Sequence, residues 1–324
     1  MVRFLAPIAL LLAGGLSGGL AQANVQASNF NKVIVFGDSL SDNGNLLALS
    51  TPLVPSVLPF GLPPAPYYQG RFSNGMAAVE HLALGLGAPL QNYAVGGATT
   101  GLLNNQVPAI PFLLNTGLLS QVNSYTGSAA DANALFVVWA GANDFLNPSG
   151  DPNVVIAQAI GNLTTAVGTL YAQGARSFLL PLLPDLGLTP RLLAQGPVAS
   201  GQASALTDIF NTALSGSYLS LLNTLPGAQF TLFDVAGSQR ALTANAAALG
   251  FTNTNAACFS GFVDNPVGTV CATPSSYVYW DEIHPSARAH EVLGAQMLAA
   301  VPEPSTYALM ALGLLGIALR RRQA

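Results

Sequence analysis

The sequence predicts an α/β fold in which a parallel sheet of five strands is covered by helices on both faces, giving three layers. Short apolar runs of the length of buried strands alternate with longer stretches whose apolar residues recur at helical spacing. Strands that alternate with helices pair in parallel, and right-handed crossovers then place helices on both faces of the sheet. Because ligands of such sheets bind beyond the carboxyl ends of the strands, residues that follow strands are the first candidates for chemistry.

Five apolar runs are expected to form the strands. They cover residues 33–36, 90–95, 135–140, 177–183 and 229–233. Helices are expected at residues 75–86, 153–172, 199–225 and 286–300, and Ser286 is suited to cap the last of them. Two segments do not fit the alternation. Residues 51–70 contain six prolines, which exclude a helix, and residues 252–279 have the composition of a loop.

The two ends of the chain have the patterns of targeting segments. Residues 1–23 begin with a basic residue, continue with an apolar stretch and end in the small-residue cleavage pattern of Ala21 and Ala23, as in a secretory signal peptide. A membrane anchor is the alternative. Near the other end, Pro302-Glu303-Pro304 is followed by an apolar run over residues 307–319 and then by three arginines. These thirteen residues fall short of the roughly 20 that a transmembrane helix needs.

The tail over residues 302–324 resembles the PEP-CTERM sorting signal of bacteria, in its Pro-Glu-Pro, its apolar segment and its arginine cluster. The resemblance implies export, recognition by an exosortase, transient association of the tail with a membrane, and residence at the cell surface or in the extracellular matrix of a Gram-negative bacterium. A plain C-terminal anchor helix is the alternative. The remaining residues, 24–301, are long enough for one large domain with a full core.

The charge balance excludes one class of partner. Outside the two end segments, six basic and thirteen acidic residues leave a net charge near −7. Such a surface repels phosphates, so nucleic acid is excluded as a partner. Charged residues make up only 7% of the chain, well below the usual quarter, which favours an extracellular protein.

The chain has two cysteines, Cys258 and Cys271. In an exported protein, a close pair of cysteines favours a disulfide that closes a small loop. The alternative is a metal site, which lacks further ligands because the chain has only three histidines. We therefore expect a Cys258–Cys271 disulfide and neither a metal nor a cofactor.

A candidate nucleophile follows the first strand. The run Phe36-Gly37-Asp38-Ser39-Leu40-Ser41-Asp42-Asn43-Gly44-Asn45 comes directly after residues 33–36. A serine that enters a turn at the end of a buried strand presents its hydroxyl to the crevice above the sheet. That hydroxyl becomes a good nucleophile only when a base takes its proton. A helix-capping role for Ser39 is the alternative.

The base is expected to be His284, with Asp281 three residues before it. One turn of chain places that carboxylate against the imidazole, where it fixes the tautomer and stabilises the imidazolium. Pro285 then starts the last helix. The other two histidines, His81 and His290, are expected to be ordinary helix residues.

Acyl transfer also needs donors for the oxyanion that develops on the carbonyl oxygen. Residues 92–100 offer glycine N–H groups, and we favour Gly97 over Gly96. Residues 139–144 offer the side-chain amide of Asn143, for which an Asx-turn is the alternative. The N–H of Ser39 is the third candidate, and Asp144 is expected to brace its loop.

Taken together, these motifs resemble those of the GDSL lipase/esterase, or SGNH hydrolase, family. The resemblance rests on Gly37-Asp38-Ser39-Leu40, Gly96-Gly97, Gly141-Ala142-Asn143-Asp144 and Asp281-x-x-His284, in that order along the chain. Two more stretches, Gly70-Arg71-Phe72-Ser73-Asn74-Gly75 and Leu183-Pro184-Asp185-Leu186-Gly187, also recur in that family. The resemblance implies a flavodoxin-like three-layer fold and a secreted carboxylic ester hydrolase that works through an acyl-enzyme. In that enzyme Ser39 is the nucleophile, His284 the base and Asp281 its orienting acid, and Ser39, Gly97 and Asn143 form the oxyanion hole.

The substrate stays open at this point. The same residues suit a polysaccharide O-deacetylase or an acyltransferase, and a catalytically idle matrix or adhesion protein is a third interpretation. The candidate substrates are acyl esters of a lipid, of a small alcohol or of a polysaccharide. Residues 53–68 are expected either to line or cover an acyl pocket or to wrap over the surface.

Overall fold

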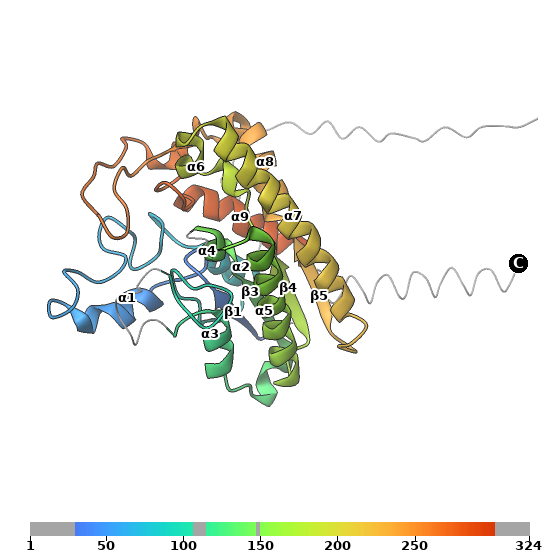
Figure 1. The fold of residues 1–324 in the computed structure, drawn as a ribbon. Coiled ribbons are helices and arrows are strands. Elements are labelled where there is room, and N and C mark those ends of the chain that lie inside the picture. Colours follow the sequence, from blue (N-terminus) through green and yellow to red (C-terminus); the bar gives the residue numbers. More distant parts are fainter. Residues whose placement is uncertain (1–29, 106–114, 147–149, 302–324) are drawn as a thin grey trace, which may run out of the picture.

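The computed structural model describes residues 30–105, 115–146 and 150–301. The expected signal peptide over residues 1–23 and the sorting tail over residues 302–324 lie outside the described residues. Within them the predicted α/β fold of three layers is confirmed (Figure 1).

The central sheet has five parallel strands in the order β2-β1-β3-β4-β5. Their bounds are β1 Lys32–Gly37, β2 Leu90–Asn92, β3 Ala134–Trp139, β4 Ser177–Pro181 and β5 Gln229–Phe233. All five are strands that the sequence predicts, although β2 and β4 end earlier than expected. The order places β2 on one side of β1 and β3 on the other. The crevice between the carboxyl ends of β1 and β3 is therefore where a ligand is expected.

Side chains of the central strands are buried on both faces of the sheet, which explains their continuous apolar runs. On β1, Ile34 and Phe36 face a core that includes α3 (Leu118–Ser124), α5 (Pro152–Ala172) and α7 (Pro197–Leu221). Val33 and Val35 face a second core with α2 (Ala78–Leu86), α8 (Val235–Ala244) and α9 (Ala287–Ala300). Helix α5 is long and apolar enough to cross a membrane, but its buried stripe packs in the first core.

The four predicted helices are confirmed as α2, α5, α7 and α9, with shifted ends. Helix α9 begins as expected, because the Ser286 hydroxyl accepts a hydrogen bond from the Ala289 N–H at 3.3 Å. Helices α3 and α8 were not predicted. The shorter helices, also not predicted, are α1 (Asn45–Ser50), α4 (Ala142–Leu146) and α6 (Pro190–Ala194).

Five single turns of 3₁₀ helix complete the helical part of the described residues: η1 (Thr51–Leu53), η2 (Ala129–Asn133), η3 (Leu186–Leu188), η4 (Ala246–Leu249) and η5 (Pro274–Ser276). The prediction of a loop over residues 252–279 was wrong in part. Strands β6 (Asn253–Ala257) and β7 (Tyr277–Tyr279) pair in parallel at its two ends.

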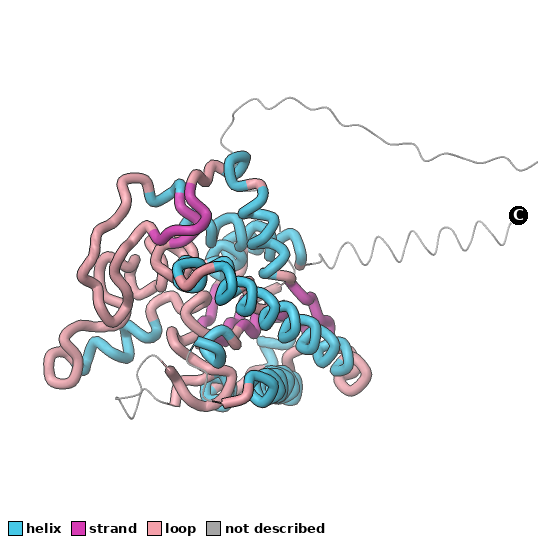
Figure 2. Tube along the Cα trace, turned by 45° about the horizontal axis from the view of Figure 1, so that its top comes forward, coloured by secondary structure: helices cyan, strands magenta, loops and turns pink. Residues whose placement is uncertain are grey.

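Two long irregular segments pack against each other beside the sheet. We call residues 51–70 the proline segment and residues 258–271, closed by the Cys258–Cys271 disulfide, the disulfide loop. The predicted disulfide is thus present. Tyr67 and Phe72 share an apolar cluster with Phe259 of the disulfide loop and with Trp280. Figure 2 shows the loops gathered on the side of the molecule opposite the long helices α5 and α7.

Candidate active site

Ser39 lies in the turn that follows β1, as the sequence predicts. A side chain at Gly37 would strike the backbone carbonyl of Trp139 on β3, so this turn approaches the neighbouring strand as only glycine allows. Buried Gln121 fixes the same point, because its amide donates to the Gly37 carbonyl at 2.8 Å and accepts from the Gly37 N–H at 2.9 Å. The start of the turn is therefore rigid, which fixes the position of Ser39.

Asp42 joins this turn to the glycine stretch after β2. Its Oδ1 accepts hydrogen bonds from the N–H groups of Gly44 and Asn45. Its Oδ2 accepts from Leu46 and, at 2.8 Å, from Gly96. The Gly96 N–H is consequently occupied.

The structure brings Ser39, His284 and Asp281 together across 245 positions of sequence. The Ser39 Oγ lies 2.9 Å from His284 Nε2, and His284 Nδ1 lies 2.7 Å from Asp281 Oδ2. Asp281 Oδ1 also accepts from the Ile283 and His284 N–H groups, at 2.9 and 2.8 Å. Burial acts to raise the pKa of Asp281, but the facing His284 and the hydrogen bonds to the carboxylate hold it below its ordinary value.

The stretch Gly70–Gly75 holds residues 281–287, which we call the histidine segment, in place. The Ser73 hydroxyl donates to the Pro285 carbonyl at 2.8 Å, and Asn74 Oδ1 accepts from the Ala287 N–H at 2.8 Å. Phe72 contacts the His284 ring, with centroids 5.1 Å apart. This motif, which the sequence offered only as a resemblance, therefore ties His284 and the start of α9 to the chain that follows the proline segment.

Three hydrogen-bond donors surround the crevice. Within the described residues, neither the Ser39 N–H nor the Gly97 N–H has an acceptor. Gly97 also has φ near 80°, a conformation that favours glycine. The Asn143 amide donates one hydrogen bond to the Ala98 carbonyl at 3.0 Å, which leaves its second N–H free to bind another acceptor. The structure thus distinguishes the two glycines, because the Gly96 N–H already donates to Asp42.

Asp144 braces the glycine stretch, as expected. Its carboxylate accepts from the Thr100 N–H at 3.0 Å and from the Thr100 hydroxyl at 2.7 Å. It therefore fixes the loop after β2 to α4, the helix that carries Asn143.

A cavity of about 110 Å³ opens beside Ser39. Its polar lining consists of Asp38, Ser39, Asn143, Thr189 and His284. Its apolar lining comes from the turn after β1, α4, the stretch after β4, helices α6 and α7 and the stretch before α9: Leu40, Ala142, Phe145, Leu146, Pro184, Leu186, Leu192, Ala203, Leu206 and Ile283. Ser39, Asn143 and His284 therefore lie at one wall of a mostly apolar pocket.

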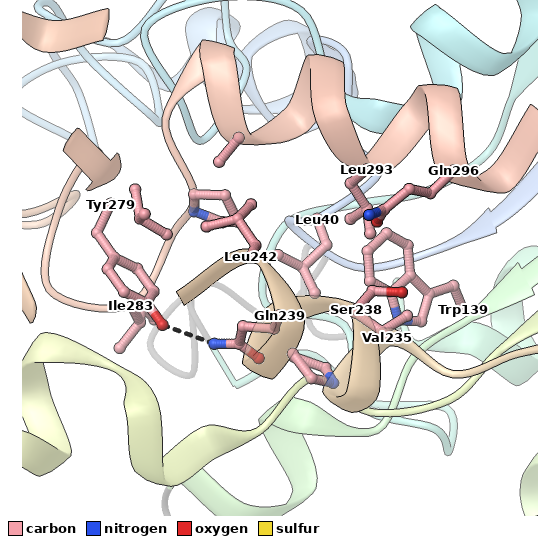
Figure 3. A pocket seen from close by; sticks show the side chains of 14 residues that line it. Leu40, Trp139, Val235, Ser238, Gln239, Leu242, Tyr279, Ile283, Leu293 and Gln296 are labelled. Atoms are coloured by element: carbon pink, nitrogen blue, oxygen red, sulfur yellow. Dashed lines mark hydrogen bonds between the residues drawn. The ribbon is translucent and has the colours of Figure 1, made fainter. Parts of the chain in front are cut away.

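A second, smaller cavity of about 60 Å³ lies next to the first (Figure 3). It is bounded by α8, α9 and the end of β3, and its lining includes Trp139, Val235, Leu242 and Leu293. Leu40, Pro184 and Ile283 line both cavities. These three side chains form the partition between the pocket beside Ser39 and the space behind it.

The disulfide loop packs against His284. Its Phe262 stacks on the His284 ring with centroids 6.0 Å apart, and the Arg191 guanidinium lies 4.8 Å from the centre of the Phe262 ring. Arg191 also pairs with Glu282 at 2.6 Å. The loop is therefore tied to α6 as well as to the histidine.

Two buried titratable groups flank the central three residues. Burial raises the pKa of Asp38 to about 7, although the Leu40 N–H donates to its carboxylate. His290 is buried in α9, its Nδ1 accepts from the Ala78 N–H, and burial lowers its pKa to about 3. His290 thus links α9 to α2 as a neutral imidazole, while His81 is a half-buried residue of α2.

The proline segment lies mostly at the surface, as one of the two expectations for residues 53–68 has it. Within the described residues, none of its side chains lines the cavity beside Ser39. It is more than a surface wrap, however, because the Tyr67 hydroxyl donates to Asp281 Oδ2 at 2.6 Å. Sequence reasoning missed this contact, since nothing in the local pattern distinguishes Tyr67 from Tyr68.

Comparison with known protein families agrees with this geometry. Residues 33–297 match the GDSL-like lipase/acylhydrolase family, and residues 300–322 match the PEP-CTERM protein-sorting motif. The sorting motif marks an exported protein that is sorted to the cell envelope.

Curated relatives lie in both plants and bacteria. The chain is 31% identical to a GDSL esterase/lipase of Arabidopsis thaliana over 314 residues, covering 82% of this chain and 81% of that protein. It is 31% identical to the thermolabile hemolysin of Vibrio parahaemolyticus, covering 85% of this chain and 65% of that protein. It is 28% identical to a phosphatidylcholine-sterol acyltransferase of Aeromonas hydrophila, covering 80% and 76%. The chain belongs to the GDSL-like lipase/acylhydrolase family and is a carboxylic ester hydrolase.

Proposed function

We propose that this protein hydrolyses esters of apolar acyl chains through an acyl-enzyme on Ser39. The observation that carries the proposal is the hydrogen-bonded line from Ser39 Oγ through His284 to buried Asp281, at the wall of an apolar cavity. Ser39 attacks the ester carbonyl while His284 Nε2 takes its proton, and Asp281 stabilises the resulting imidazolium. His284 then protonates the leaving alcohol, and water repeats the cycle on the acyl-enzyme.

The oxyanion hole in this proposal consists of the N–H groups of Ser39 and Gly97 and the amide of Asn143. The free Gly97 N–H and the occupied Gly96 N–H support the choice between the two glycines. Asp42 and Asp144 hold the loops that carry these donors. They therefore act on the reaction only through position.

Replacing Asn143 with alanine is expected to lower kcat by about 10²–10³-fold, because one of the three donors to the oxyanion is lost. The KM is expected to change little, since this hydrogen bond strengthens only as charge develops on the carbonyl oxygen. Steady-state kinetics on a p-nitrophenyl ester measures both constants. Equal kcat values for Asn143→Ala and wild type would remove Asn143 from the oxyanion hole.

The lining of the cavity favours longer acyl chains over acetyl groups. Measured on p-nitrophenyl esters of two, four, eight and sixteen carbons, kcat/KM is expected to be higher for the eight-carbon ester than for the two-carbon ester. Ala203→Phe places a ring in the cavity, so it is expected to lower this preference by at least about tenfold. Ala205→Phe, on the exposed side of the same helix α7, is the matched control. A wild-type preference for acetate, together with acetate release from an acetylated polysaccharide, would instead support the O-deacetylase interpretation.

An acyltransferase is the second candidate function. The specific observation in its favour is the similarity to an enzyme whose name states that it transfers acyl groups from phosphatidylcholine to a sterol. Adding an alcohol acceptor during ester turnover distinguishes a hydrolase from an acyltransferase. A hydrolase releases fatty acid at the same rate with or without acceptor, whereas a transferase diverts the acyl group into a new ester.

We further propose the location of the mature protein. Residues 1–23 are removed as a signal peptide, residues 24–301 form the hydrolase domain, and the tail over residues 302–324 is recognised by an exosortase. The match of residues 300–322 to the sorting motif supports the last of these steps. The enzyme then acts at the cell surface or in the extracellular matrix of a Gram-negative bacterium.

A further inference from the structure

Tyr67 of the proline segment contacts Asp281, the carboxylate that pairs with His284, across 214 positions of sequence. Its hydroxyl donates to Asp281 Oδ2 at 2.6 Å, and the same oxygen lies 2.7 Å from His284 Nδ1. Tyr67 is 6% exposed and Asp281 is fully buried, so water does not compete for this oxygen. Two donors therefore share one carboxylate oxygen.

The four contacts of the Asp281 carboxylate divide evenly between its two oxygens. Oδ1 accepts from two backbone N–H groups of the histidine segment, and Oδ2 accepts from Tyr67 and His284. Burial and the facing carboxylate both raise the pKa of the Tyr67 hydroxyl far above its ordinary value. The hydroxyl consequently stays a donor over the whole pH range in which the enzyme works.

The ring of Tyr67 is held from several sides. Phe72, Phe259 and Trp280 meet it edge to face, with centroids 5.7 to 6.4 Å away. Phe259 belongs to the disulfide loop and stacks on Trp280 with centroids 5.6 Å apart. These three rings, of which Phe259 comes from the disulfide loop, thus form a fixed socket that directs the hydroxyl to Asp281.

We propose that Tyr67 is a positioning residue for the reaction, which tunes His284 by sharing Asp281 Oδ2 with it. A hydrogen bond donated to a carboxylate oxygen withdraws part of the charge that this oxygen offers to a second donor. With Tyr67 in place, Asp281 still orients the imidazole, but its Oδ2 offers less charge to His284 Nδ1. This inference rests on the proposed function.

Other titratable or charged groups also face this site, and the test has to leave them unchanged. They come from the β1 turn, α6, α9, the disulfide loop and the histidine segment: Asp38, Arg191, His290, Asp264 and Glu282. A change confined to the Tyr67 hydroxyl alters none of these side chains.

The test compares Tyr67→Phe with Tyr68→Phe in the full-length protein. Tyr68 is the adjacent, largely exposed tyrosine and serves as the matched control. Among the described residues, removing the Tyr67 hydroxyl leaves His284 as the only donor to Oδ2. We expect the midpoint of the acidic limb of the kcat/KM profile to move up by about one pH unit. At a pH on that limb, Tyr67→Phe is expected to be about tenfold slower than wild type, with less than threefold difference on the plateau.

A second variant is expected to move the acidic limb in the opposite direction while the ring keeps its packing. Tyr67→3-fluorotyrosine keeps the ring and makes the hydroxyl a stronger donor, so the acidic limb is expected to move to lower pH. This variant decides the matter if Tyr67→Phe fails to fold. The tuning role of Tyr67 would be overturned if the acidic limb of the kcat/KM profile stayed in place in both variants. It would also be overturned if Tyr67→Phe lost rate uniformly at every pH. A different result would count against the proposed function, namely ester turnover that persists in folded Ser39→Ala.

Discussion

Replacing Ser39 with alanine is expected to lower kcat on a p-nitrophenyl ester by roughly 10⁵–10⁶-fold. The loss is this large because, in the proposed mechanism, the hydroxyl forms the covalent bond to the acyl group. Within the described residues its partner is His284 Nε2 at 2.9 Å. Alanine leaves the turn intact, since Gly37 and Gln121 fix the backbone there. Substrate binding in the cavity is expected to persist, so the effect falls on kcat.

Ser41→Ala provides the matched control for this experiment. Ser41 lies two residues away in the same turn and is fully buried, and its hydroxyl finds no hydrogen-bond partner among the described residues. Its loss is expected to leave kcat within a factor of about three. Residual turnover of Ser39→Ala above about one per cent of wild type, in folded protein, would contradict an acyl-enzyme on Ser39.

Asp281→Asn is expected to lower kcat by about 10⁴-fold without a large change in shape. In wild type, two backbone N–H groups donate to Asp281 Oδ1, so the amide oxygen of an asparagine takes that position. The amide NH₂ then replaces Oδ2 and faces His284 Nδ1. That nitrogen becomes an acceptor, and the imidazole proton moves to Nε2. His284 can then no longer accept the Ser39 proton.

The control for this variant is Glu282→Gln, which changes the neighbouring, half-exposed carboxylate that pairs with Arg191. It is expected to leave kcat nearly unchanged. Steady-state kinetics and thermal unfolding of both variants separate lost chemistry from lost structure. A decrease of less than tenfold in folded Asp281→Asn would show that the tautomer of His284 does not depend on this carboxylate.

Much of this arrangement follows from local sequence. The five strands are readable because their side chains are buried on both faces, as the alternation of Val33 and Val35 with Ile34 and Phe36 shows. Ser39 and Asn143 follow β1 and β3, which flank the point where the strand order changes side. That position is what the rule for parallel sheets predicts. Asp281 and His284 are three residues apart, so a single turn of chain brings them together.

Other features depend on contacts that no local pattern encodes. The choice between Gly96 and Gly97 depends on Asp42, 54 positions earlier, which occupies one of the two N–H groups. The contact of Tyr67 with Asp281 spans 214 positions and depends on the packing of the proline segment against the disulfide loop. Strand β6 is mostly polar and strand β7 has three residues, so neither has a clear strand pattern. They form by pairing with each other. Helix α8 has a low apolar content, with Val235, Ala236 and Leu242 as its buried residues, and it packs against α9.

In the proposed reaction, the acyl group passes through Ser39. This step is tested most directly by treating the folded protein with a fluorophosphonate ester, then measuring its intact mass and mapping the modified peptide. We expect one adduct per chain, on Ser39, and none on Ser39→Ala. Labelling is expected to be strongly slowed in Asp281→Asn. An adduct on another residue, or the absence of any adduct from protein that still turns over esters, would contradict the account.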